Sequence, residues 1–220
     1  MTRFLAFCFA LCLFGQPMIG FGQDETAAPD APETLEERIP TVSLICPPGM
    51  ALVPSMKIRD GEMQEAFCID LFEYPNEIGV MPILDISWIE AESLCFKAGK
   101  RLCTSGEWQS ACQGPAQTAY PYGVSYFPET CNTEQEWMMN GSKAFPSGTF
   151  PGCVSGYGVL DMSGNVSEWT TSDTESAVIF GGSWLSGRFS TCRSSYTLDK
   201  SVRYVFNGAR CCKAPAIEIK

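Results

Sequence analysis

The chain has 220 residues, of which 45% are hydrophobic and only 18% charged, and its net charge is −10. This length fits one domain of ordinary size, and 20 glycines with 15 prolines indicate many turns and loops. The net charge and the lack of lysine and arginine clusters argue against nucleic acids or anionic membranes as partners. The sequence contains no histidine, which excludes Ser-His-Asp triads, Cys-His dyads and histidine-bound iron.

The N-terminal segment has the features of an export signal. Arg3 precedes an apolar run over residues 4–14, which is too short for the roughly 20 residues of a membrane helix. Small residues at Gly20 and Gly22 suit a cleavage site, so residues 1–22 are predicted to be a signal peptide and not a membrane span. Export to the periplasm or outside the cell follows from this prediction.

Residues 23–40 are acidic and rich in proline and alanine. Such a segment buries too little apolar surface to offset the entropy lost on ordering, so a disordered linker is predicted. The folded domain is therefore expected to span residues 41–220.

Twelve cysteines are present, and two of them fall within the predicted signal peptide. The remaining ten are an even number in a protein expected to reach an oxidising compartment, which predicts five disulfides. Their pairing cannot be deduced from the sequence, although Cys46 and Cys68 are candidates for a cross-strand pair.

Residues 41–53 and 67–73 are rich in apolar, β-branched and aromatic side chains and are expected to form strands joined by a turn at Gly61. Three polar residues here are expected to be solvated or turn-forming groups rather than ligands: Asp70, Glu73 and Asn76.

Two helices are predicted from their capping residues. Ser87 with Glu90 forms one capping box ahead of an apolar helical face, and Gly99 ends that helix. Thr104 with Glu107 begins the second helix in the same way.

A basic pair, Lys100 and Arg101, lies between the two predicted helices. It could contact an anionic ligand, but a role in satisfying nearby carbonyls and carboxylates is favoured.

The segment 156–169, GYGVLDMSGNVSEW, carries two carboxylates across a Ser-Gly-Asn turn. Asp161 and Glu168 could point with intervening backbone carbonyls at one hard cation. The alternative is that both carboxylates only cap turns.

Nine fragments in this order resemble the formylglycine-generating enzyme, or sulfatase-modifying factor, family: residues 86–88, 98–102, 107–108, 120–123, 156–158, 161–166, 168–169, 181–184 and 208–210. The resemblance covers about residues 46–213. It implies one compact, loop-rich α+β domain of the C-type-lectin-like kind, here stapled by disulfides, with bound calcium. Active members of the family oxidise a sulfatase cysteine to formylglycine with oxygen and a copper ion held by two thiolates.

The resemblance also implies calcium ligands. One site maps onto four residues of the 156–169 segment: Asp161, Gly164, Val166 and Glu168. A second site begins at Asn132 and Thr133, but its later aspartate has no counterpart in residues 134–143.

The copper ligands of the family are not both retained. Ser186 occupies the place of the first cysteine, while Thr191 occupies the second with Cys192 one residue beyond. Ser183 matches a serine near the reaction centre of the family, and Ser167 replaces a tryptophan. Serine cannot substitute for a thiolate toward Cu(I).

Two functions are therefore considered. The first is an exported, calcium-stabilised and non-catalytic module that presents loops 114–140 and 186–203 to a protein, peptide or glycan. The alternative is a copper-dependent oxidase with Ser183 and Cys192 as catalytic candidates, its metal held by Cys192 with Cys211 or Cys212.

Overall fold

The computed structural model describes residues 41–57, 61–133, 143–172 and 176–220. All of them belong to one unit, Pro40–Lys220. The predicted signal peptide and linker, and residues 134–140 of the first predicted binding loop, lie outside the described residues. Among the helices of the described part, none is both long and apolar enough to cross a membrane.

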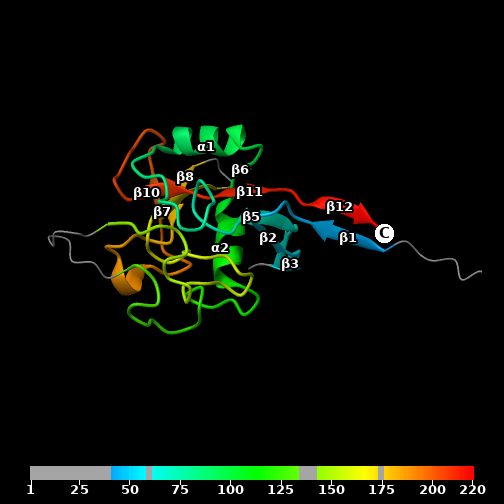
Figure 1. Ribbon diagram of the computed structural model, residues 1–220, viewed down its shortest axis with the longest axis horizontal. Helices are drawn as coiled ribbons and strands as arrows, with labels where there is room; N and C mark the ends of the chain where they lie inside the picture. Colours follow the sequence, from blue (N-terminus) through cyan, green and yellow to red (C-terminus); the bar gives the residue numbers. More distant parts are fainter. Residues whose placement is uncertain (1–40, 58–60, 134–142, 173–175) are drawn as a thin grey trace, which may run out of the picture. The chain divides into compact units, whose positions relative to one another are not determined.

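Two four-stranded sheets form the centre of the unit (Figure 1). The first has the order β10 (Asn207–Ala209), β7 (Ser167–Thr171), β8 (Ala177–Phe180) and β9 (Ser195–Leu198), and only the β10–β7 pair is parallel. The second has the order β2 (Met50–Val53), β5 (Phe67–Asp70), β11 (Cys211–Lys213) and β6 (Arg101–Leu102), and all its pairs are antiparallel.

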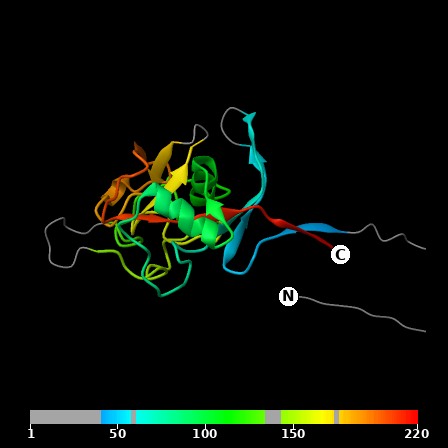
Figure 2. The same ribbon diagram turned by 90° about the horizontal axis from the view of Figure 1, so that it is seen from above.

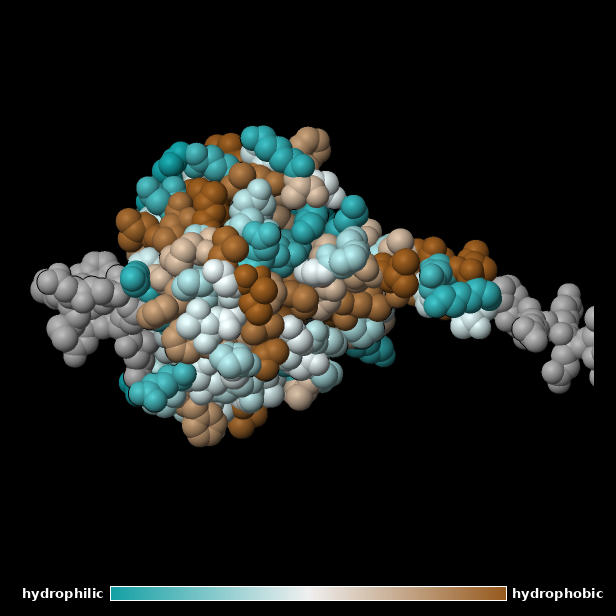
Figure 3. Space-filling view, in the orientation of Figure 1, coloured by the Kyte–Doolittle hydropathy of each residue, from teal (hydrophilic) through white to brown (hydrophobic). Residues whose placement is uncertain are grey.

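Two smaller ribbons complete the strands: β1 (Val42–Ile45) with β12 (Ala216–Ile219), and β3 (Met56–Lys57) with β4 (Met63–Gln64). The β1–β12 ribbon extends away from the two central sheets (Figures 1 and 2). Several of its hydrophobic side chains are exposed, and they appear on the face drawn in Figure 3.

The strand expected over residues 41–53 is in fact two strands, β1 and β2, which pair with different partners. Two prolines and Gly49 lie between them, and the Met50 N–H bonds to the Pro47 carbonyl in a turn. Proline cannot donate to a strand ladder, which is why one continuous strand does not form. The strand expected over residues 67–73 ends at Asp70.

Both predicted helices are confirmed: α1 (Trp88–Lys97) and α2 (Ser105–Gln113). Ser87 and Glu90 form the reciprocal capping box of α1, and Thr104 and Glu107 form that of α2. Gly99, with φ of +69°, follows the end of α1 in the left-handed conformation that glycine adopts without steric cost. A short 3-10 helix, η2 (Gly187–Phe189), lies between β8 and β9.

Five disulfides are present, as predicted, and they pair all ten cysteines from Cys46 onward: Cys46–Cys68, Cys95–Cys211, Cys103–Cys212, Cys112–Cys192 and Cys131–Cys153. The candidate pair Cys46–Cys68 is confirmed. The adjacent residues Cys211 and Cys212 tie β11 to α1 and to the segment that follows β6. Five disulfides are typical of a protein that folds in an oxidising compartment.

The expectation of solvated or turn-forming groups was correct for Asn76, which lies in a turn, and wrong for Asp70 and Glu73. Both carboxylates are fully buried. Lys100 forms an ion pair with Asp70, and Arg101 forms one with Glu107. The basic pair therefore satisfies carboxylates of its own chain, as favoured from the sequence.

Candidate functional site

The predicted calcium loop turns into the interior of the molecule. Asp161 and Asn165 have positive φ angles of 60° and 56°, and the loop leads directly into β7. Gly164 is required here, since a Cβ atom would lie only 2.3 Å from the Asn132 carbonyl oxygen. Asp161 and Glu168 are consequently 3% and 1% exposed, so both carboxylates face protein groups rather than solvent.

Glu168 is held by a buried arginine. The Arg210 guanidinium donates to both carboxylate oxygens, through Nη2 to Oε1 at 2.7 Å and through Nε to Oε2 at 2.9 Å. The Trp108 indole N–H donates to Oε2 at 2.6 Å. Glu168 therefore fits poorly as a calcium ligand, because its charge and its oxygens are already engaged.

Asp161 fits a calcium ligand better. One of its oxygens, Oδ2, accepts a hydrogen bond from the Gly148 N–H at 2.7 Å. Burial raises the pKa of this carboxyl to about 6, which shows that nearby protein groups compensate its charge only in part. The carbonyls of Gly164 and Val166 accept no hydrogen bond from the loops and turns of the described chain. These three groups could supply oxygens to a hard cation.

Asn132 and Thr133, where the second predicted calcium site begins, form hydrogen bonds with the rest of the described chain. Their carbonyl oxygens accept hydrogen bonds from the N–H groups of Asn165 and Gly187, each at 2.8 Å. The Asn132 amide also donates to the Asn165 side-chain oxygen at 2.8 Å. The structure thus brings Asn132 against the first loop as a packing and hydrogen-bonding partner. Within the described residues, no group of three or more Asp, Glu, Cys or His side chains is arranged to hold a metal ion.

Glu73 joins this cluster, and the sequence did not predict it. Its carboxylate accepts hydrogen bonds from the Asn165 amide at 2.8 Å and the Ser147 hydroxyl at 2.7 Å. Burial, followed by repulsion from Asp161, raises its pKa to about 8. Its position at the end of an apolar run, FCIDLFE, was the available indication of burial. Arg210 interacts electrostatically with all three carboxylates, so negative charge exceeds positive charge in the cluster when all three ionise.

The buried Glu73 carboxyl predicts a pH dependence of stability. Its pKa is about 8 in the folded state and near 4.5 when the chain is unfolded, so between these values the folded state holds a proton that the unfolded state has released. The free energy of unfolding should therefore fall as pH rises from 5 to 8, by an amount on the order of 1 kcal/mol per pH unit. Urea denaturation with a calcium chelator present measures this slope.

Glu73→Gln is the matched variant, because it keeps the shape of the side chain and cannot ionise. Its slope should be clearly flatter than that of the unmodified protein. Equal slopes in the two proteins would assign the pH dependence to other groups.

Cys192 forms a disulfide with Cys112 and is fully buried. Cys211 and Cys212 are paired with Cys95 and Cys103. A disulfide sulfur carries no thiolate, and the thiolate is the form that binds copper. The cysteine pairs considered for the oxidase are therefore not available as ligands in this disulfide state.

Ser183 and Ser186 lie together in the loop that follows β8. The Ser186 hydroxyl accepts a hydrogen bond from the Ser183 N–H at 2.9 Å, and the Ser183 hydroxyl accepts one from the Leu185 N–H at 3.4 Å. Gly182 packs tightly behind them, against the buried Ser190. Hydrogen bonds to the hydroxyls of Ser183 and Ser186 therefore stabilise the loop. Ser186 stands where the family resemblance places the first copper cysteine.

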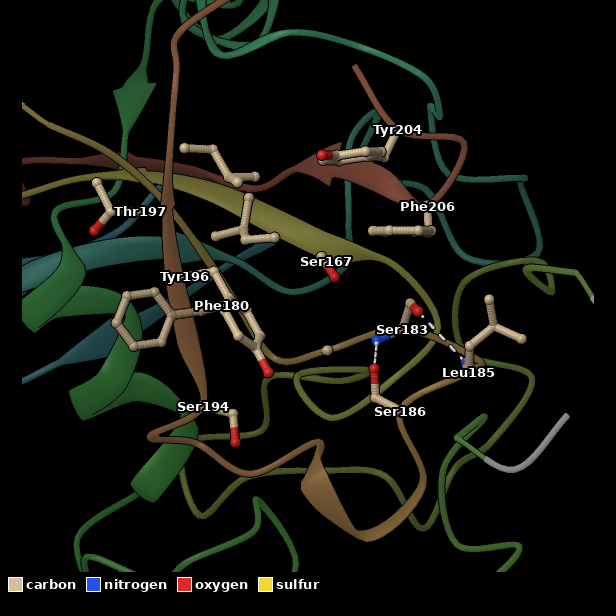
Figure 4. Close-up of a pocket in the computed structure, with 13 residues that line it drawn as sticks. Ser167, Phe180, Ser183, Leu185, Ser186, Ser194, Tyr196, Thr197, Tyr204 and Phe206 are labelled. Carbon is tan, nitrogen blue, oxygen red and sulfur yellow. Dashed lines mark hydrogen bonds between the residues drawn. The ribbon is translucent and has the colours of Figure 1, made fainter. Parts of the chain in front are cut away.

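A pocket of about 500 Å³ opens beside this loop. Ser167, Ser183 and Ser186 line it together with aromatic side chains of β9 and of the segment before β10. Ser167 lies between Tyr196 on one side and Phe206 with Tyr204 on the other (Figure 4). The aromatic residues were not predicted as site residues, and no local motif marks them, because the fold alone brings these strands together.

The two predicted binding loops meet next to the pocket. The Tyr120 hydroxyl donates to the Arg188 carbonyl at 2.7 Å, and the Cys192 N–H donates to the Ala119 carbonyl at 2.9 Å. The Cys112–Cys192 disulfide adds a covalent link close by. The described part of loop 114–140 and the loop 186–203 therefore form one connected surface.

Comparison with known proteins identifies the family. Residues 72–215 match the sulfatase-modifying factor enzyme 1-like domain, and the chain belongs to this family. It is 35% identical over 117 residues to the inactive C-alpha-formylglycine-generating enzyme 2 of Bos taurus, covering 47% of this chain and 38% of that protein. It is also 35% identical over 101 residues to the formylglycine-generating enzyme of Mus musculus, covering 41% and 27% respectively. The chain thus spans less than two fifths of the length of these relatives.

Solved structures show the same fold. CarF aligns with a TM-score of 0.61 at 15% identity, covering 77% of this chain and 99% of that one. Treponema denticola variable protein 1 aligns with a TM-score of 0.59 at 15% identity, covering 80% and 100%. At this identity the likeness concerns the fold alone.

Proposed function

We propose that this protein is an exported, non-catalytic member of its family that binds a partner through the pocket and the two loops beside it. The observation that carries the proposal is the absence of a thiolate pair among the described residues. Ser186 stands at the place of the first copper cysteine, and Cys192 is locked in a disulfide with Cys112. The similarity to relatives named as inactive supports the same conclusion.

The binding role is supported by the surface itself. Loops that a rigid scaffold holds in place are common sites of recognition. Here the Tyr120 hydroxyl bonds to the Arg188 carbonyl and the Cys192 N–H to the Ala119 carbonyl, which connects the described parts of loops 114–140 and 186–203. The Cys112–Cys192 disulfide ties the second loop to α2. The partner would be a protein, a peptide or a glycan in the periplasm or outside the cell.

An oxidase assay tests the proposal directly. The purified protein is given Cu(I), oxygen and a cysteine peptide of the sulfatase type, and peptide oxidation is followed by mass spectrometry. No copper-dependent product is expected, since a serine hydroxyl and a disulfide cannot replace two thiolates. Copper-dependent formation of formylglycine would overturn the proposal in favour of the oxidase alternative.

Calcium is proposed as a stabilising ion, bound by Asp161 with the carbonyls of Gly164 and Val166. The excess of buried carboxylates over guanidinium in the cluster supports a cation here. A ligand that binds only the folded state stabilises it by mass action. At a hundredfold excess over Kd, calcium should raise Tm by about 5–10 °C.

The variant Asp161→Ala should abolish this rise in Tm, because it removes the side-chain oxygen that would bind the ion. Asp199→Ala is the matched control, since Asp199 is exposed and the hydrogen bonds of its side chain go to Ser201. Differential scanning fluorimetry with calcium and with chelator measures the shift. A calcium-dependent rise that persists in Asp161→Ala, or no rise in the unmodified protein, would refute the site.

A further inference from the structure

The proposed function includes binding in the pocket, and the chemistry of the residues that line it limits which class of ligand can bind there. The pocket volume of about 500 Å³ lies within the range of small-molecule sites. None of the residues that line it carries a formal charge. A ligand that brought its own carboxylate, phosphate or ammonium group into the pocket would find no counter-charge there, and desolvating that group would cost affinity.

Two of the serine hydroxyls that line the pocket have spare donor capacity. Ser183 and Ser186 each accept a hydrogen bond from a backbone N–H, and neither donates one to another group of the described chain. Ser167, on β7, also turns its side chain into the pocket (Figure 4). A hydroxyl carries one donor and two acceptor positions, so these side chains can both donate to and accept from a ligand.

The walls of the pocket are aromatic and partly open to solvent. Tyr196 is 67% exposed and Tyr204 is 43% exposed. The Tyr204 ring stacks on Phe206 with 5.3 Å between the ring centroids and an angle of 9° between the planes. Exposed tyrosines offer a rigid apolar surface with a polar tip, which suits a ligand that has apolar and hydroxylated faces.

Building on the proposed function, we propose that this pocket binds a neutral sugar ring, such as an uncharged hexose residue of a glycan. A pyranose has a face of C–H groups that packs on an aromatic ring and a rim of hydroxyls that pairs with serine side chains. It carries no charge that the lining would have to balance. The combination of aromatic walls, serine hydroxyls and an uncharged lining fits this class of ligand better than a peptide with ionised side chains or ends.

The experiment titrates the full domain with methyl glucoside, methyl galactoside and methyl mannoside, followed by ¹H–¹⁵N NMR. At least one of these neutral glycosides should bind with a Kd of about 1 mM and shift the resonances of residues that line the pocket. Methyl glucuronide is the charged counterpart of methyl glucoside and should bind at least tenfold more weakly.

Tyr196→Ala and Tyr204→Ala should each weaken binding of that glycoside by about tenfold. Phe96→Ala is the matched control, because Phe96 is an exposed aromatic residue on α1 that belongs neither to the pocket nor to the two loops. It should leave the affinity unchanged. Melting curves confirm that each variant is folded.

Three results would overturn the inference: no neutral glycoside binds, glycoside affinity is unchanged in both tyrosine variants, or the glucuronide binds as well as the glucoside. Each of these would leave the non-catalytic binding function standing, with a peptide panel on the same protein as the next probe. Failure of the proposed function is seen separately, as copper-dependent product in the oxidase assay.

Discussion

Replacing Arg210 with methionine is expected to destabilise the folded domain by about 3–5 kcal/mol, because it leaves the Glu168 carboxylate buried without a counter-charge. Both side chains are essentially inaccessible to solvent, at 0% and 1% exposure. Arg210 also donates to the backbone carbonyls of Asp70 and Leu160, so those acceptors lose a partner as well. Urea denaturation at pH 7 measures the change in the free energy of unfolding.

Arg203→Met is the matched control for this prediction. Arg203 pairs with Glu90 at the surface, where water screens the interaction, and no resolvable change in stability is expected. A second test combines Arg210→Met with Glu168→Gln, which removes the orphaned charge and should recover part of the lost stability. A loss of less than about 1 kcal/mol in Arg210→Met would contradict the assigned role of this ion pair.

The second large effect concerns the disulfides that join distant parts of the chain. Removing both Cys95–Cys211 and Cys103–Cys212 with four alanine substitutions should cost at least about 5 kcal/mol, because these bonds close loops of 116 and 109 residues between the same two parts of the chain, so either bond alone would keep the unfolded chain crosslinked. Cys131–Cys153 closes a loop of 22 residues and should cost about 3 kcal/mol. Denaturation of the quadruple-alanine variant and of the double-alanine variant of Cys131–Cys153 compares these losses.

The pair Cys131–Cys153 is the proper control because its two cysteines are buried, as are all four cysteines of the longer-range pairs. The cavity cost per substituted cysteine is therefore similar, and the difference in loss beyond that cost reports on loop length. Equal losses, or a larger loss for the shorter loop, would show that strain or local packing governs these disulfides instead.

Local features of the fold were predicted well from the sequence. The capping pairs Ser87 with Glu90 and Thr104 with Glu107 each lie within one helical turn, so the sequence alone contains both partners. The disulfide count followed from an even number of cysteines, and the family followed from nine short fragments in order. These properties depend on neighbours in the chain.

Features that depend on distant contacts could not be predicted. Glu73 was predicted to be a solvated or turn-forming residue. It is buried instead, and it accepts hydrogen bonds from Ser147 and Asn165, which lie 74 and 92 residues further along the chain. The ion pair between Glu168 and Arg210 joins residues that are 42 positions apart, so no local sequence pattern predicts it. The pocket is formed by loops from two sides of β9, and only the folded sheet brings Tyr196 and Tyr204 to face Ser167.

The central claim is that this domain keeps the fold of its family without a thiolate pair for copper. Mass spectrometry after denaturation and alkylation without reductant tests it most directly. We expect that none of the ten cysteines from Cys46 onward is labelled, because all are paired. Labelling of Cys112 and Cys192 in the purified protein would contradict it, since a thiol beside the Ser183–Ser186 loop would again be free to bind copper.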